Sequence, residues 1–257
     1  MKSFFRPARV PDPAALREHR PVIRSLQRRR LLRGGMSLGA LALLTGCDAE
    51  DTDAIGAALR HFSDFNDRVQ GWIFDPDKLA STYPASMVQK PPRFNAYYDI
   101  MDVRPVDGAS WRLELAGLIA ERAPWSAAQI QALPQREIII RHICVEGWDY
   151  IGQWSGVPLR DFLERVGADT RARYVNFRTA DDYPSSIDMA TALHPQTLLA
   201  TRYAGEDLPA PFGYPLRLRT STKLGFKNPK WITAIEVTNT YTPGYWEKRG
   251  FNWFSGI

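Results

Sequence analysis

The most informative stretch of the chain, residues 137–148, reads EIIIRHICVEGW. Its β-branched run at 138–140 is typical of a buried strand, and the run leads into Cys144, one of only two cysteines in the 257 residues. A lone cysteine at the end of a strand has three interpretations: an inert core residue, a nucleophile, or a single-thiolate metal ligand. Most buried cysteines are inert, so this stretch alone leaves all three open.

Basic charge gathers at the N-terminal end. Of the 33 basic and 28 acidic residues, ten basic and two acidic ones lie within residues 1–46, which leaves 23 basic and 26 acidic for the rest. The remainder of the chain is therefore slightly acidic, and its composition gives no sign of a nucleic-acid partner. Its length and its 44% hydrophobic content suit one sizeable domain with a small appendage.

The N-terminal residues have the layout of an export signal. Residues 27–33 read QRRRLLR, a short apolar run covers 34–44, and LTGC ends at Cys47. The arginines resemble a twin-arginine signal and LTGC resembles a bacterial lipobox, so residues 1–46 are predicted to be removed and Cys47 to be lipidated. This predicts export by the twin-arginine translocase and a periplasmic protein anchored to a membrane by lipid without spanning it. A basic amphipathic helix is the alternative.

The rest of the chain is divided into a tether with an N-terminal helical segment packed on the main domain, residues 47–90, and a domain at 91–257. No GxGxxG or Walker A loop is present, which argues against Rossmann and P-loop nucleotide sites. Strands mixed with short helices indicate an α+β domain with mixed β-sheets. Periodicity predicts strands at 111–118, 137–144, 174–179, 216–220 and 231–240, helices at 53–69, 126–133 and 158–166, and a strand or short helix at 186–193.

Several motifs together resemble the sulfite oxidase family of molybdopterin-dependent oxidoreductases. Within that family, the motifs are most similar to those of one branch, the catalytic subunits of bacterial periplasmic protein-methionine-sulfoxide reductases. The resemblance covers about residues 90–257 and depends on the order and spacing of the motifs. They are NAYYD at 95–99, RHICVEGW at 141–148, WSGVPL at 154–159, YVNFRT at 174–179, LHP at 193–195, GYPLR at 213–217 and KLGFKNPK at 223–230.

The resemblance implies a sulfite-oxidase-type fold, a Mo-molybdopterin cofactor and Cys144 as the protein ligand of the metal. Soft thiolate ligation suits molybdenum, and one cysteine suffices because the cofactor brings its own sulfurs, whereas a zinc site would need several protein ligands. For Arg217 alone a surface charge is the alternative, and for His194 a core histidine. The family pattern, with His194 added as a further contact, gives the cofactor-binding residues as Asn95, Tyr98, Asp99, Cys144, Thr179, His194, Arg217, Asn228, Pro229 and Lys230.

Two further residues are candidates for catalysis beside Cys144. Glu146 follows the ligand closely and can relay protons, although a helix-cap or salt-bridge role is equally compatible with the sequence. Tyr183 is a candidate substrate contact in the short loop 180–184.

The chain also departs from the family pattern. Phe212 occupies a position where the reductases have an asparagine, Asp99 replaces a glutamate, and the loop 180–184 is short. Two aspartates in that loop oppose a dianion such as sulfite. The expected reaction is therefore oxygen-atom transfer in the direction of sulfoxide or related S- or N-oxide reduction, on a small-molecule or protein substrate. Electrons are expected from a membrane cytochrome or a quinone-linked subunit.

Three other functions remain open from the sequence. One is a sulfite-oxidising enzyme of the same family. The second is a non-catalytic binding or scaffold lipoprotein in which Cys144 is merely buried. The third is a cysteine hydrolase, with His142 on the same strand face as Cys144.

Overall fold

The structure is a computed structural model that describes residues 52–257. The predicted leader, the twin-arginine motif and the lipobox at Cys47 lie outside these residues. Within them, no helix combines the length and the apolar character that crossing a bilayer requires.

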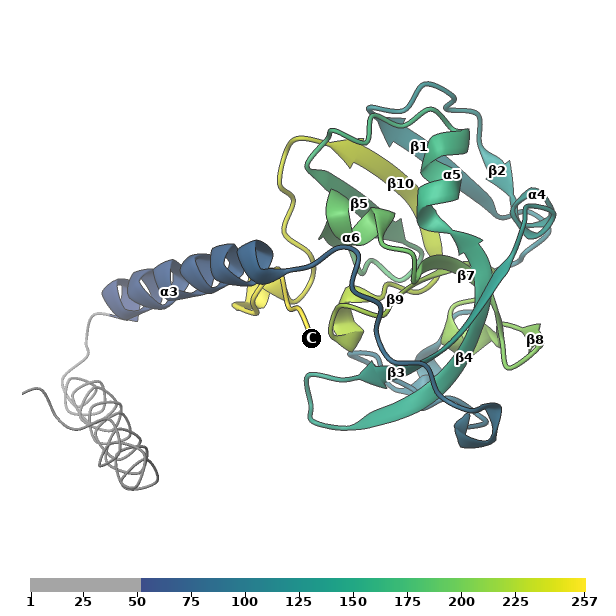
Figure 1. The fold of residues 1–257 in the computed structure, drawn as a ribbon, viewed down its shortest axis with the longest axis horizontal. Helices are drawn as coiled ribbons and strands as arrows, with labels where there is room; N and C mark the ends of the chain where they lie inside the picture. The colour runs from purple at the N-terminus through teal and green to yellow at the C-terminus, as the bar shows by residue number, and fades with distance from the viewer. Residues whose placement is uncertain (1–51) are drawn as a thin grey trace, which may run out of the picture. The chain divides into compact units, whose positions relative to one another are not determined.

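One five-stranded sheet joins the two ends of the domain sequence (Figure 1). Its neighbours β1 and β10 run parallel, and its other pairings are antiparallel, so the sheet is mixed as predicted. The strand order is β2 (Trp125–Ser126), β1 (Arg112–Gly117), β10 (Ile232–Thr238), β5 (Tyr174–Thr179) and β6 (Ser185–Asp188).

A second sheet carries the stretch with Cys144. The long hairpin of β3 and β4 forms one side of it, and β9 pairs with β7. The strands are β3 (Arg136–Ile143), β4 (Asp149–Pro158), β7 (Thr197–Tyr203), β8 (Glu206–Asp207) and β9 (Arg217–Thr220).

Short helices connect the strands. Ser126 caps α4 in a reciprocal capping box with Gln129, the arrangement that satisfies two free backbone donors at once. The predicted strand or helix at 186–193 is both, because β6 leads directly into α6. The α-helices after the N-terminal segment are α4 (Ala127–Gln131), α5 (Leu159–Arg165) and α6 (Met189–Leu193), and the 3-10 turns are η2 (Ala85–Met87), η3 (Ile100–Asp102), η4 (Ala210–Phe212), η5 (Gly225–Lys227) and η6 (Glu247–Arg249).

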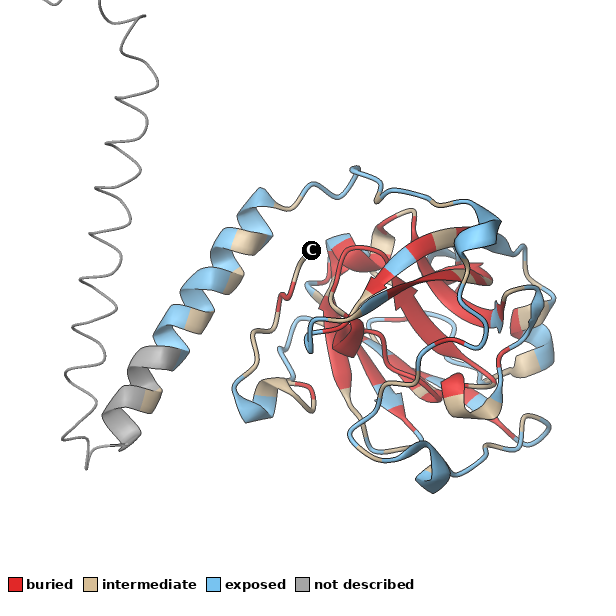
Figure 2. Ribbon diagram, turned by 90° about the horizontal axis from the view of Figure 1, so that it is seen from below, coloured by how far each residue is buried: buried red, intermediate tan, exposed pale blue. Residues whose placement is uncertain are grey.

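The main core includes side chains from α5 and the first sheet. Leu113, Phe162 and Ile235 are fully buried in it, and Figure 2 shows the strands mostly buried. Each such side chain contributes about 1.5–3 kcal/mol through burial. A second, smaller core includes Ile140 and Trp154 on the β3–β4 hairpin, so the strand that leads to Cys144 is anchored on its buried face.

The sequence did not predict β4, the longest strand of the protein. Gly152 and Gly156 interrupt its apolar pattern, and glycine usually weakens a strand. The structure shows why it is tolerated: a Cβ at Gly156 would lie 2.1 Å from the carbonyl oxygen of Leu199 on the neighbouring strand. Close approach of two backbones therefore requires a residue without a side chain there.

The N-terminal segment is a long helix, α3 (Thr52–Ile73), of 22 residues. It extends four residues beyond the predicted end at Val69. Side chains from its C-terminal half contact the last residues of the chain.

Candidate active site

Cys144 lies directly after β3, in a tight turn that leads into β4. Its backbone N–H donates to the carbonyl of Trp148 at 2.9 Å, and its own carbonyl accepts from Gly147 at 3.1 Å. Gly147 has a φ of 88°, which a residue with a side chain rarely adopts. The turn therefore fixes the cysteine at the end of a rigid hairpin, and the cysteine is buried.

A cavity of about 160 Å³ opens beside Cys144. It gathers residues that are far apart in the sequence, from the loop before η3 to the segment after β9. Seven of the predicted site residues line it: Asn95, Cys144, Glu146, Tyr183, Asn228, Pro229 and Lys230.

Aromatic rings form one part of the wall. Tyr97 stacks on Tyr245 with ring centroids 4.3 Å apart, and Tyr183 stacks on Tyr245 at 5.4 Å. The Tyr183 hydroxyl donates to the carbonyl of Phe226 at 2.8 Å, and burial raises the pKa of this phenol. Tyr183 is therefore a fixed, neutral wall residue.

Two carboxylates face the same cavity. Glu146 accepts a hydrogen bond from the Trp148 indole at 2.7 Å and lies 3.9 Å from the Cys144 sulfur. Asp181, from the short loop after β5, accepts from the Tyr98 hydroxyl at 3.0 Å. Tyr98 itself lines a separate polar hollow on the other side of Asp181.

Three cations have no acidic partner in the described part of the chain: Lys230, which lines the cavity, and Arg217 and Arg219. Arg217 and Arg219 are each 1% exposed and Lys230 is 7% exposed. The ion pairs among residues 52–257 include none of the three. Burial lowers the pKa of Arg219 to about 9 and that of Lys230 to about 7. A bound anion would offset the cost of burying this positive charge.

Arg217 and Arg219 also have buried nitrogen atoms without a hydrogen-bond partner, whereas the Lys230 ammonium donates to the Asn95 carbonyl at 2.7 Å. Both ring nitrogens of His142, the Trp154 indole nitrogen, Nε and Nη2 of Arg217 and Nε of Arg219 have no such partner. The Arg217 guanidinium lies 4.6 Å from the centre of the Trp154 ring, so the unpaired nitrogens of these two residues are close neighbours. Buried donors are normally satisfied. An anionic, heteroaromatic group with a phosphate, such as molybdopterin, fits this set of donors.

Arg219 was missed by the sequence prediction. A signal was available, because residues 217 and 219 are two apart on β9 and side chains on a strand alternate in direction. Arg219 shares the buried face with Arg217. It donates to the carbonyl of Arg141 at 2.8 Å and to the side-chain oxygen of Asn228 at 3.0 Å.

Five of the predicted cofactor residues do not line the Cys144 cavity: Tyr98 and Arg217, described above, and Asp99, Thr179 and His194. Asp99 is exposed and caps η3 through the backbone N–H of Met101. The Thr179 hydroxyl accepts from the Tyr183 backbone and shapes the loop between them. The two ring nitrogens of His194 lie 3.1 Å from the Lys78 carbonyl and 3.1 Å from the Gln196 N–H. The core-histidine alternative describes that geometry best.

Two further residues have local roles. The Asn228 amide is fully used inside the protein, since its oxygen accepts from Thr220 and Arg219 and its nitrogen donates to two carbonyls. Phe212, the departure from the family pattern, packs against Phe94, and its carbonyl accepts from Arg217 at 2.9 Å. The residue thus still holds Arg217 through its backbone.

The cysteine-hydrolase alternative finds no support in this geometry. His142 is fully buried, and burial together with the nearby arginines holds its pKa well below its usual value. No hydrogen bond joins His142 to Cys144 in the described part of the chain, where the thiol contacts Glu146 instead.

The described residues contain no cluster of three or more His, Cys, Asp or Glu side chains able to hold a metal ion.

Residues 100–246 match the oxidoreductase molybdopterin-binding domain family. The chain belongs to this family. It is a molybdenum-dependent oxidoreductase whose cofactor is Mo-molybdopterin, and its mixed sheet and its antiparallel sheet form the sulfite-oxidase-type fold.

Individual relatives refine the comparison. A provisionally named protein-methionine-sulfoxide reductase subunit, YedZ1, of Azospira oryzae is 56% identical over 89% of this chain and 87% of its own. The catalytic subunit MsrP of the protein-methionine-sulfoxide reductase of Xanthomonas campestris is 31% identical over 57% of this chain. That match spans 52% of MsrP, about half its length.

One solved structure supports the fold. The sulfane dehydrogenase SoxCD of Paracoccus pantotrophus superimposes with a TM-score of 0.50 and 18% identity, over 54% of this chain and 40% of that one. At this identity the similarity concerns the fold alone.

Proposed function

We propose that this oxidoreductase reduces sulfoxides or related S- or N-oxides, with Cys144 as the protein ligand of molybdenum. When bound, the cofactor supplies two-electron oxygen-atom transfer. Reduction of a sulfoxide consumes two electrons and two protons and yields a sulfide and one water. The observation that carries the proposal is the position of Cys144, the one cysteine among residues 52–257, between an open cavity and buried cations that no carboxylate neutralises.

The chain's own residues divide the work. Arg217, Arg219 and Lys230 hold the anionic part of the cofactor. The stacked rings of Tyr97 and Tyr183 limit the access of water to the cavity. In this proposal Glu146 carries protons toward the reacting oxygen, since its carboxylate is exposed on one side and lies 3.9 Å from the Cys144 sulfur on the other.

The charge of the cavity favours a neutral oxide over sulfite. Asp181, Glu146 and Lys230 all line it, whereas Arg217 and Arg219 are not among its lining residues. A dianion at the mouth would face two carboxylates at close range. The names of the MsrP and YedZ1 relatives support a sulfoxide substrate. The alternative, sulfite oxidation, would require an anion site for which the mouth offers no arginine among the residues that line it.

The rest of the proposal concerns location and electron supply. The arginine motif and the lipobox support twin-arginine export, lipid attachment at Cys47 and a periplasmic location. Electrons come from a membrane cytochrome or a quinone-linked subunit.

Molybdenum content and turnover, measured together on protein exported through its own signal, test the proposal. The parent should hold near-stoichiometric molybdenum and reduce methionine sulfoxide with a reduced viologen dye. Cys144→Ser should lower turnover by more than about a hundredfold, because even the partners of metal ligands are worth ten- to a hundredfold. Asp149→Asn is the matched control, since Asp149 lies on the same hairpin and pairs at the surface with Arg141.

Two results would contradict the proposal. Rapid oxidation of sulfite with cytochrome c, without sulfoxide turnover, would reverse the direction of the reaction. Undiminished turnover in Cys144→Ser would remove the cysteine from the metal site.

A further inference from the structure

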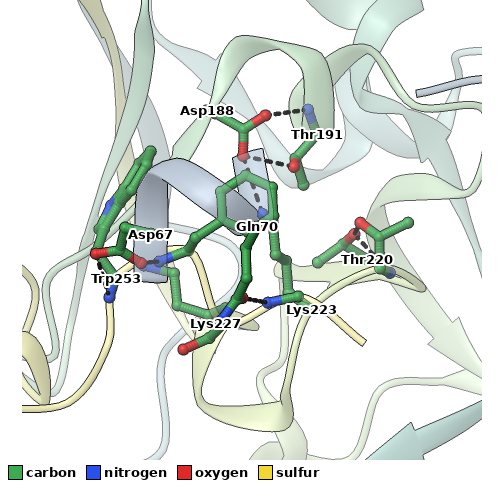
Figure 3. Close-up of polar contacts among 12 residues, drawn as sticks. Asp67, Gln70, Asp188, Thr191, Thr220, Lys223, Lys227 and Trp253 are labelled. Atoms are coloured by element: carbon green, nitrogen blue, oxygen red, sulfur yellow. Dashed lines mark hydrogen bonds and ion pairs between the residues drawn. The ribbon is translucent and has the colours of Figure 1, made fainter. Parts of the chain in front are cut away.

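The helix α3 has an unusual distribution of side chains over residues 60–73. A helix turns by about 100° per residue, so Ser63, Asp67 and Gln70 lie on one face. This polar face contacts the protein's own C-terminal residues. The Asp67 carboxylate accepts from the backbone N–H of Phe254 at 2.6 Å, and the Gln70 side chain accepts from that of Gly256 at 3.0 Å. Figure 3 shows Asp67 beside Trp253, near the buried Lys227.

The opposite face of the same helix is apolar and exposed. We call it the outer stripe: Phe62, Phe65, Val69, Trp72 and Ile73, which are 72%, 64%, 37%, 85% and 65% exposed. Figure 2 colours most of this part of α3 as exposed. Surface helices of soluble domains normally turn the apolar face inward and the polar face to water. Here the arrangement is reversed, so the outer stripe is suited to an apolar medium outside the domain.

We propose that the outer stripe lies in the interfacial layer of a lipid bilayer. Its composition fits, because phenylalanine and tryptophan are the side chains that interfacial helices place at the boundary between headgroups and acyl chains. His61 and Arg68, both exposed, flank the stripe on one side and can meet lipid phosphates.

The chain before the helix points to the same occupant. Cys47 lies five residues before Thr52, where α3 begins, and five residues span at most about 18 Å. A lipid on Cys47 would therefore keep α3 within reach of the membrane surface. This proximity rests on the lipid attachment proposed above, whereas the chemistry of the stripe does not. An interfacial helix would add a second attachment beside the lipid.

Quenching by brominated lipid tests the proposal directly. The exported, processed holoenzyme is reconstituted into vesicles of phosphatidylethanolamine and phosphatidylglycerol with brominated phosphatidylcholine. Tryptophan emission should be quenched, and Trp72→Phe should remove most of that quenching while keeping the stripe apolar. Trp111→Phe is the matched control, because Trp111 is 6% exposed inside the domain and should leave the quenching unchanged.

Placing the tryptophan at other positions on the helix makes the test more specific. In the Trp72→Phe background, Phe65→Trp should restore quenching because both positions belong to the outer stripe. Arg60→Trp should not restore it, since residue 60 lies toward the polar face. Equal quenching from both positions, or none from either, overturns the proposal. Protection of Trp72 only in membranes that contain an electron-donating protein also overturns it and points to a protein partner.

These outcomes are independent of the enzymatic proposal. The mass of the mature N-terminal peptide reports whether Cys47 is acylated, and molybdenum content reports the cofactor. Quenching that survives without acylation would support the stripe and contradict the anchor.

Discussion

Two groups of buried cations in this domain have opposite environments. Lys227 is fully buried but forms an ion pair with Glu247, and Lys223 lies 3.1 Å from the Asp188 carboxylate. Arg217 is equally buried and has only one hydrogen bond, to the Phe212 carbonyl. The first group is neutralised by the protein itself. The second has no carboxylate partner among the described residues, which supports the proposal that it holds the anionic part of the cofactor.

The largest effect on stability is expected when an ion pair of the first group loses one partner. Glu247→Gln leaves the Lys227 ammonium buried without a counter-charge, and removal of one partner of a buried pair costs about 3–5 kcal/mol. Chemical denaturation of the cofactor-free protein measures this change in the free energy of unfolding. A double variant with Lys227→Met should recover part of it, since the uncompensated charge is then gone.

A surface pair provides the control. Glu114 pairs with Arg178 at 3.0 Å, and both side chains are about two-thirds exposed. Glu114→Gln should cost no more than about 1 kcal/mol. If Glu247→Gln costs as little as Glu114→Gln, the Lys227 pair is not a structural pair and the comparison fails.

The next largest effect is expected on cofactor retention, when a cation of the second group is removed. Arg217→Met should weaken retention of the molybdenum cofactor by about ten- to a hundredfold, because each charge-assisted hydrogen bond to a phosphate is worth about 1.5–3 kcal/mol. The stability of the cofactor-free protein should not fall, since the variant removes an unpaired buried charge and one hydrogen bond. Molybdenum per chain and the unfolding midpoint are measured on the same sample.

Lys223→Met is the control for Arg217→Met, because it removes a buried cation of the first group. It should retain molybdenum and lower the stability, because Asp188 loses its counter-ion. If Lys223→Met and Arg217→Met change molybdenum content and stability in the same way, the distinction between the two groups has no physical basis.

The same distinction explains what the sequence could and could not predict. Apolar spacing and the Ser126 cap predicted α4, α5 and most strands because these depend on local patterns. The turn at Cys144 and the residues at 228–230 were predicted as site residues from family motifs. Strand β4 was missed since its glycines serve a contact with Leu199 that no local pattern reveals.

The cation site shows a second limit. Motif matching found Arg217 but not Arg219, although both point into the same interior. Whether a basic residue on a strand faces solvent or a cofactor depends on which sheet face is covered, and that depends on the whole fold. His194 illustrates the reverse case. Its two ring nitrogens meet the Lys78 carbonyl and the Gln196 N–H, contacts that lie 116 and two residues away in sequence.

The smallest effect expected is the contribution of Lys230, in the second group, to the pH dependence of stability. Lys223 in the first group adds a rise of its own at higher pH, because burial lowers its pKa to about 8. Burial lowers the pKa of Lys230 to about 7, from the 10.5 of an ordinary lysine. Between these values the unfolded chain binds more protons at this site than the folded chain does, so the stability of the cofactor-free protein should rise with pH through this window. Between pH 7 and 9 the gain is about 1–2 kcal/mol.

Lys230→Met should remove the contribution of Lys230 and leave that of Lys223, whereas Glu114→Gln should leave both unchanged. Loading with cofactor should also remove the contribution of Lys230, because a bound anion favours the charged ammonium and returns its pKa toward the ordinary value. Unfolding curves at pH 7 and pH 9, with and without the cofactor, measure all of these differences. If the parent and Lys230→Met still differ in this gain when loaded with cofactor, no anion reaches Lys230, and the cation site would consist of Arg217 and Arg219 alone.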